Sequence, residues 1–302
     1  MKMPLKATVY MDVPVEVRTR TPSINRTLDI QIGSICCGLR CPDDEVYHRL
    51  RRLYGNFLAE QSADVTIELE RTPGRNGSEV DDQVFSVLRD EPDVFVVEMQ
   101  CSPAESDAGF RPLNRLFYLA YYSACLEKYG GSLPAMLVHA CGVLRRGRAL
   151  VLAGPSESGK TTIAGLCGEN DGRVINDEMV LLSRPARDGG TSVQSVPITG
   201  GFPPGINITV PLSCILLLKK GSRTRVKPVA PVDAYLRFIR QIVTPTYLGQ
   251  REGRTAAAMV ADFSQETTSA VPVYELEFTL DGESLWREIG ELEATMYGQV
   301  TK

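Results

Sequence analysis

The sequence predicts an α/β chain in two parts: a smaller α+β unit over residues 1–130, and a larger α/β unit with a mixed sheet over residues 131–302. Three observations predict this. Apolar and polar residues alternate near the N-terminus, as in half-buried strands. A nearly all-apolar helix over 112–129 ends at a Gly-Gly-Ser break. A strand, a glycine-rich loop and a helix then follow one another over 149–166. A length of 302 residues also suits two domains of about 150 residues.

The composition narrows the class of protein. Lys and Arg number 33 against 37 Asp and Glu, a net charge of -4, so the chain lacks the basic excess that binding to nucleic acid requires. Hydrophobic residues make up 43%, enough for a folded core. No apolar run approaches the ~18 residues of a membrane span. We therefore expect a soluble, cytoplasmic protein with no membrane or nucleic-acid partner.

Eight cysteines are scattered through the chain, mostly inside apolar runs, which favours reduced core thiols over a disulfide framework. The one cluster is Cys36, Cys37 and Cys41. A zinc site needs a further pair of ligands, and the nearest candidate is His48 alone. We therefore interpret the cluster as structural, and His48 as a surface residue of the following helix.

The elements of the first unit follow from periodicity. Strands are predicted over 7–19 and 26–33, paired with each other, because every second residue is apolar. A helix over 43–61 has an acidic start and an apolar stripe that ends at Phe57 and Leu58. Strands over 63–71 and 93–100 flank a polar, turn-rich loop.

The second unit follows a buried helix over 112–129 that begins with Pro112. Its first strands form a hairpin that turns at Arg145, Arg146 and Gly147. The further predictions are a strand over 149–153, a helix over 161–166, strands over 174–183 and 211–220, a hairpin turn over 219–225, a helix over 232–243, a strand over 271–278 and a helix over 283–297.

The strand over 149–153 runs into a phosphate-binding motif, G-x-x-x-x-G-K-[ST], and a helix follows it. The motif residues are Gly154, Pro155, Ser156, Glu157, Ser158, Gly159, Lys160 and Thr161, with Thr162 next in the helix. Its glycines let backbone N–H groups turn inward around a phosphate. Lys160 is expected to bridge the β- and γ-phosphates and Thr161 to contact Mg²⁺. The sequence therefore predicts ATP and Mg²⁺ as ligands.

Asp177 and Glu178 supply the next acidic group, and Asp177 comes only 16 residues after Thr161. In most P-loop ATPases and GTPases the metal-binding acid lies further along the chain. The chain also has no LSGGQ or NKxD segment, which disfavours transporter ATPases and G proteins. His139 precedes the loop; a lone histidine in an apolar segment is usually a core residue, but the hairpin would bring this one near the nucleotide.

A histidine-containing strand, a hairpin, a phosphate loop and a closely following acidic pair together resemble the catalytic domain of HPr kinase/phosphorylase and its relatives, over about residues 133–300. That family shares a nucleotide-binding fold with phosphoenolpyruvate carboxykinase. The resemblance implies a P-loop kinase domain with a mixed sheet, in which residues 154–162 bind the phosphates. It implies that Asp177 is the base that activates the acceptor hydroxyl, with His139 supporting it and Lys160 on the phosphates. Thr161, Asp177 and Glu178, which replaces a second Asp, would hold the metal.

The second signature of that family, a Glu-x-Arg-Gly segment, is only echoed by GGFPPGINIT over 200–209, which lacks the Glu and the Arg. Phosphorolysis, and HPr itself as the substrate, are therefore not implied. Basic residues near the site are mostly expected to be solvated, with Arg240 favoured as a contact to an acidic substrate. The other candidates are Arg145, Arg146, Arg148, Lys219, Lys220, Arg223, Arg225 and Arg237.

The function predicted from these residues is an ATP- and Mg²⁺-dependent kinase that phosphorylates a hydroxyl, of Ser or Thr, on a small protein or peptide. Three alternatives stay open: a kinase of a free metabolite, a nucleotide-binding regulatory protein without phosphotransfer, and a carboxykinase-like or hydrolytic enzyme. HPr-type kinases form ring oligomers, so the resemblance also implies a homo-oligomer. The role of the first unit, in regulation or in docking the substrate, stays open too.

Overall fold

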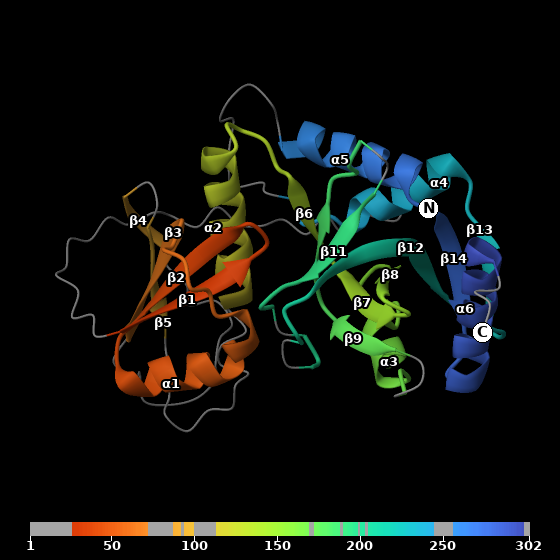
Figure 1. Cartoon of the computed structure of the whole chain (residues 1–302), viewed down its shortest axis with the longest axis horizontal. Helices are drawn as coiled ribbons and strands as arrows, with labels where there is room; N and C mark the ends of the chain where they lie inside the picture. The colour runs from red at the N-terminus through yellow and green to blue at the C-terminus, as the bar shows by residue number, and fades with distance from the viewer. Residues whose placement is uncertain are drawn as a thin grey trace, which may run out of the picture.

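The computed structural model describes residues 26–71, 87–91, 94–99, 113–168, 172–187, 190–198, 200–202, 205–244 and 256–298. Over these ranges the chain is a mixed α/β protein with six α-helices and a large mixed sheet (Figure 1). Within the same ranges, no helix combines the length and the apolar character needed to cross a membrane. The strand predicted over 7–19 lies outside the described residues.

The first sheet has five strands in the order β1-β2-β3-β5-β4 (Figure 1). Their bounds are β1 Arg26–Ile32, β2 Ile35–Cys41, β3 Val65–Arg71, β4 Val87–Glu91 and β5 Val94–Met99. β2, β3 and β5 run parallel, while β1 and β4 are antiparallel to their neighbours. The predictions of β1, β3 and β5 are confirmed, and β4 was not predicted.

β2 contains the cysteine cluster and pairs antiparallel with β1, whereas the predicted pairing of 26–33 with 7–19 involves residues outside the described ranges. Cys36, Cys37 and Cys41 are all buried in this strand. Burial raises the pKa of Cys36 to about 11, so the thiol stays protonated and packs as a small apolar group. Six of the seven residues of β2 are buried. A strand buried on both faces shows no alternation, and for this reason the sequence pattern did not reveal it.

Helix α1 (Asp44–Leu53) begins as predicted, because the Asp43 side chain accepts a hydrogen bond from the Val46 N–H at 2.9 Å. It ends earlier than the predicted 43–61. A 3-10 turn, η1 (Gly55–Phe57), follows and buries Phe57, whereas Leu58, predicted on the apolar stripe, is 38% exposed. Leu58 instead forms a β-bridge with Ile30, which ends the helix and ties it to the sheet.

Helix α2 (Leu113–Lys128) is buried as predicted and lies between the two sheets (Figure 1). The Tyr121 hydroxyl donates to the Ala135 carbonyl at 3.1 Å. The Tyr122 hydroxyl accepts from the Leu137 N–H at 3.0 Å and donates to the Val243 carbonyl at 2.9 Å. One hydrophobic core therefore runs from the first sheet through α2 into the second.

The second sheet has nine strands, in the order β6-β10-β11-β12-β8-β7-β9, and β14 and then β13 extend it from β12. Their bounds are β6 Ala135–Val138, β7 Ala140–Arg145, β8 Arg148–Ala153, β9 Arg173–Asn176, β10 Val180–Ser183, β11 Ser192–Ser195, β12 Thr209–Lys220, β13 Arg225–Pro228 and β14 Val273–Phe278. The predicted β7–β8 hairpin is confirmed. The long strand β12 pairs first with β11, then with β8 and β14, and so joins the two halves of the sheet.

Two predicted features of this sheet are wrong. The strand predicted over 174–183 is two strands, β9 paired with β7 and β10 paired with β6 and β11. The segment 219–225 is not a hairpin turn, since β14 lies between β12 and β13, parallel to the first and antiparallel to the second. β11 and β13 were not predicted.

Helices cover both faces of the second sheet (Figure 1). Their bounds are α3 Lys160–Gly165, α4 Pro231–Phe238 with the 3-10 turn η3 Ile239–Gln241, α5 Ala256–Ala270 and α6 Gly282–Tyr297. Phe238 of α4 and Phe263 of α5 join the large core, while Ile163 of α3 and Trp286 of α6 form a second core on the other face. The helices α3, α4 and α6 were predicted. α5 was not, because its buried stripe includes polar residues such as Thr267.

Candidate functional site

The loop of residues 154–159 joins the end of β8 to the start of α3. Two of its glycines are required by close contacts. A Cβ on Gly154 would lie 2.6 Å from the Ser158 Oγ, and a Cβ on Gly159 would lie 2.5 Å from the Phe278 ring. Gly159 also has φ +104°, which L side chains rarely adopt. The loop therefore turns tightly at Gly154 and Gly159, where a side chain would clash with neighbouring atoms.

Lys160 points back into this loop and is 6% exposed. Its Nζ donates to the carbonyls of Gly154 and Pro155, at 2.9 and 3.2 Å. Burial lowers the pKa of Lys160, and the nearby Glu178 opposes that shift. The Oγ of Ser158 is buried with no hydrogen-bond partner in the described part of the chain. A buried ammonium and an unsatisfied hydroxyl together form a polar interior that a phosphate group would complement.

Two strand breaks that face each other place the histidine and the acids beside this loop. His139 separates β6 from β7, and residues 177–179 separate β9 from β10. Because β7 pairs with β9 and β6 with β10, the breaks lie side by side. The prediction put His139 within a strand; it lies in the break, where its N–H donates to the Gln241 carbonyl at 2.7 Å.

Asp177 is 2% exposed and lies against the start of α3. Its Oδ2 accepts from the Thr161 hydroxyl at 3.2 Å and from the Gly201 N–H at 2.9 Å, and its Oδ1 accepts from the Phe202 N–H at 3.3 Å. A Cβ on Gly200 would lie 2.5 Å from the Asp177 Oδ1. The loop over 200–202 is thus part of the site. In the sequence, the adjacent Gly200 and Gly201 are the signal for this loop, although sequence analysis alone shows them only as an echo of a family signature.

The oxygen atoms around Asp177 fit a bound Mg²⁺. Ligands on adjacent corners of an octahedral Mg²⁺ lie about 3 Å apart, close to the 3.2 Å between the Thr161 Oγ1 and the Asp177 Oδ2. Among the described residues, no three His, Cys, Asp or Glu side chains converge to hold a metal. This donor set suits an ion held by one or two protein oxygens together with substrate phosphates and water, which is the usual arrangement for Mg²⁺.

His139 and Glu178, one from each strand break, lie next to each other, with 3.6 Å between the His139 Nε2 and the Glu178 Oε1. Burial, with a smaller contribution from the Lys160 charge, lowers the pKa of His139 to about 4. The imidazole is therefore neutral at pH 7, and the contact with Glu178 is not an ion pair at that pH.

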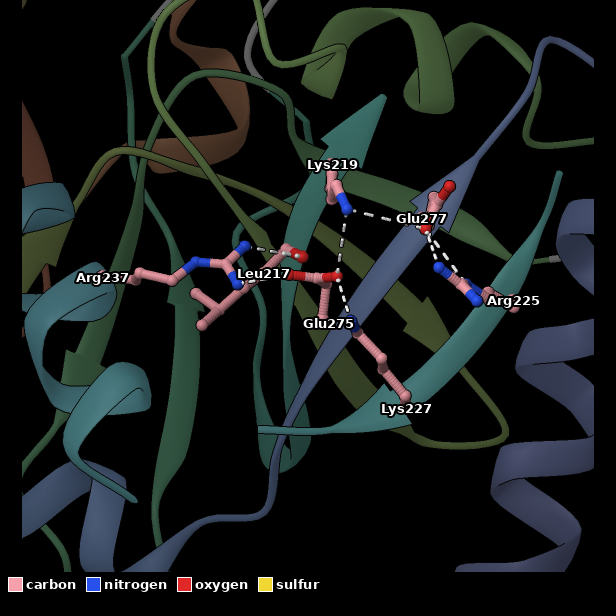
Figure 2. Close-up of polar contacts among 7 residues, drawn as sticks. All are labelled: Leu217, Lys219, Arg225, Lys227, Arg237, Glu275 and Glu277. Carbon is pink, nitrogen blue, oxygen red and sulfur yellow. Dashed lines mark hydrogen bonds and ion pairs between the residues drawn. The ribbon is translucent and has the colours of Figure 1, made fainter. Parts of the chain in front are cut away.

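Most of the basic candidates have structural partners. Two carboxylates of β14, on Glu275 and Glu277, bind the basic side chains around them, as Figure 2 shows. The pairs are Arg237 with Glu275 at 2.6 Å, Lys227 with Glu275 at 3.0 Å, Arg225 with Glu277 at 2.6 Å, and Lys219 with both at 3.8 to 3.9 Å. Arg145 likewise binds Glu293 at 2.8 Å.

Arg240, the favoured basic residue, is exposed and directly precedes Gln241, whose carbonyl accepts from the His139 backbone. It therefore lies on the His139 side of the site. His48 is exposed on α1, as predicted.

Comparison with known proteins gives little beyond this geometry. No protein-family model and no curated protein sequence matches the chain. Among solved structures, the HPr(Ser) kinase/phosphatase from Coxiella burnetii aligns with 54% of this chain and 99% of its own, at 13% identity and a TM-score of 0.30. That level of similarity does not establish a common fold or a common activity.

Proposed function

We propose that this protein is an ATP- and Mg²⁺-dependent kinase that transfers the γ-phosphate to a hydroxyl, of Ser or Thr, on a small protein or peptide. The observation that carries the proposal is the contact between the Thr161 hydroxyl and the Asp177 carboxylate at 3.2 Å. It joins the end of the phosphate loop to an acid that the sequence placed only 16 residues away. Phosphoryl transfer requires a phosphate cradle, a metal site and a carboxylate in one place.

Each residue has a role in this proposal. The loop over 154–159 surrounds the phosphates with backbone N–H groups, and Lys160 exchanges its two carbonyl contacts for phosphate oxygens. Thr161 and Asp177 would hold Mg²⁺, which neutralises phosphate charge when bound; Glu178, which the sequence also predicted as a ligand, has its Oε1 3.6 Å from the His139 Nε2. Asp177 orients the acceptor hydroxyl and takes its proton, while the neutral His139 lies beside Glu178, the next residue in the chain.

A transfer assay with labelled ATP and candidate small proteins or peptides, read by mass spectrometry, tests the proposal. Lys160→Ala is expected to weaken ATP binding about 10- to 100-fold, because it removes a charged hydrogen-bond donor to the phosphates. Asp177→Asn is expected to keep ATP binding in EDTA and to lower transfer at least about 100-fold, since the proton acceptor is lost. Glu291→Gln, exposed on α6, is the matched control and should change neither.

A second candidate is a nucleotide-binding regulatory protein without phosphotransfer. The observation that favours it is that both oxygens of Asp177 already accept hydrogen bonds from Thr161 and the loop over 200–202. The same assay separates the two. ATP binding without transfer to any acceptor, together with an Asp177→Asn variant identical to wild type, would replace the kinase proposal with this one.

A further inference from the structure

Asn176, the last residue of β9, forms hydrogen bonds through both ends of its side-chain amide, and the proposed mechanism does not use it. It is 5% exposed. Its Nδ2 donates to the carbonyls of Val196 and Ile198 at 3.2 and 2.7 Å. Its Oδ1 accepts from the N–H groups of Glu178 and Met179 at 2.8 and 2.9 Å. An amide offers two donors and two acceptor lone pairs, so all four positions are used.

The two ends of this amide act on two different segments. The oxygen closes a turn over the next three residues, which ends β9 and directs Asp177 toward Thr161. The nitrogen fixes the chain at 196–198, directly ahead of the loop whose Gly201 and Phe202 N–H groups bind Asp177. A single side chain therefore holds both the backbone that carries Asp177 and the loop that clamps its carboxylate.

We propose that Asn176 is a positioning residue that sets the orientation of the Asp177 carboxylate for Mg²⁺ and nucleotide. The identity of the ligand, Mg²⁺ and nucleotide, rests on the proposed function. The hold of Asn176 on the Asp177 carboxylate does not depend on that function. If Asn176 had only a structural role, loosening the segments that it binds would leave the Asp177 carboxylate in place. Here every partner belongs to the turn that includes Asp177 or to the segment leading into its clamp. The carboxylate is therefore expected to move when the amide is altered.

Asn176→Asp is the sharpest variant, because it keeps the size of the side chain and replaces both N–H donors with an oxygen facing two carbonyls. Asn176→Ala is the second variant. Ser195→Ala is the matched control. Ser195 is also fully buried, and its hydroxyl donates to the Ile206 carbonyl and accepts from the Ile208 N–H, neither of which belongs to the turn over 177–179 or to the loop over 200–202. It reports what the loss of a buried polar bridge does to stability alone.

The first measurement is ATP binding by calorimetry, with Mg²⁺ and with EDTA. Wild type is expected to bind ATP more tightly with Mg²⁺. In Asn176→Asp, the increase in ATP affinity caused by Mg²⁺ should be about 10- to 100-fold smaller, because changes to residues that support metal ligands weaken metal binding by that much. The ATP affinity measured in EDTA should stay the same. Ser195→Ala should retain the gain. The second measurement is hydrogen exchange at the amides of Gly201 and Phe202, which should quicken in the Asn176 variants and not in Ser195→Ala.

These readings separate the two proposals. If wild type binds no ATP, the proposed function fails, and the exchange rates alone decide whether Asn176 holds the clamp on Asp177. The inference is overturned if exchange at Gly201 and Phe202 stays at the wild-type rate in Asn176→Asp. It is overturned equally if exchange quickens while the Mg²⁺ gain persists, because Asn176 would then support the fold without orienting the carboxylate.

Discussion

Contact distances around Asp177 leave no room for one additional methyl group. A Cβ on Gly200 would lie 2.5 Å from the Asp177 Oδ1 and 2.8 Å from the Glu178 Cβ, so Gly200→Ala must displace either the loop or the acid. We expect it to lose the Mg²⁺-dependent part of ATP binding by about 10-fold or more, since small displacements at a reactive site are costly. Calorimetric titration with ATP and Mg²⁺ measures this.

The control for that change is Gly165→Ala at the end of α3, where an added Cβ meets nothing within 4 Å. It should leave binding unchanged and leave stability unchanged or slightly higher, because alanine favours helix. Equal binding by both glycine variants would show that the loop over 200–202 yields freely and does not fix Asp177.

The depressed pKa of His139 predicts a pH dependence of stability. Its folded pKa is about 4, against about 6.5 unfolded, so between these values only the unfolded chain takes up the proton. The contribution of His139 to folding is thus complete above pH 6.5 and is lost as the pH falls toward 4. Between pH 7 and pH 4.5, wild type should lose about 2 kcal/mol more than His139→Gln in its free energy of unfolding.

Urea denaturation at the two pH values measures this difference, in which the contributions of all other groups cancel. A variant that parallels wild type over the whole range would show that folding does not lower the pKa of His139. The same variant tests catalysis separately: a lower transfer rate with unchanged stability at pH 7 would assign His139 to the reaction.

Among the elements, β14 carries two carboxylates, on Glu275 and Glu277, that bind basic side chains of neighbouring elements. Burial alone would raise the pKa of Glu275, but hydrogen bonds from Lys227 and Arg237 lower it overall. Lys227 comes from β13, Arg237 from α4 and Lys219 from β12, so one carboxylate joins three elements (Figure 2). These ion pairs connect β14 to both of its neighbours in the sheet, β12 and β13.

Glu275→Gln is expected to destabilise the fold by about 1–3 kcal/mol, because it leaves several cations around a neutral amide. The loss is not larger because these cations are partly exposed and water screens their charge. Thermal unfolding of this variant measures the effect, with the exposed Glu291→Gln as the control. If the two variants melt together, the cluster contributes nothing to holding β13 and α4 on the sheet.

For the whole molecule, the core shared through α2 predicts that the two sheets unfold together. One buried cluster includes residues from β1 and β2, from α2 and from one face of the strands β6 to β12. Trp286 is the single tryptophan and lies in α6, so its fluorescence reports on the second sheet alone. Fluorescence and far-ultraviolet circular dichroism should therefore give one coincident transition. Separate midpoints would establish the division at residue 130 as two independently folding domains.

A substitution of Tyr122, in α2, tests the same coupling between the two sheets. Its hydroxyl bridges the Leu137 N–H and the Val243 carbonyl, both beyond α2 in the sequence. Tyr122→Phe leaves a buried donor unsatisfied and should cost about 1–3 kcal/mol. The loss should appear equally in the fluorescence and dichroism transitions, whereas an effect on one signal alone would mean that α2 couples the sheets weakly.

The local features follow from the sequence alone: the loop from Gly154 to Thr161, the β7–β8 hairpin, the buried helix α2, and His139 and Asp177 as candidates on either side of the loop. Each depends on a motif, a turn or a periodicity carried within a few residues. Tertiary structure alone decided that β2 is a strand, that β14 separates β12 from β13, and that Asn176 breaks the strand predicted over 174–183. Strand partners distant in sequence leave no local pattern, and burial on both faces removes the alternation that marks a strand.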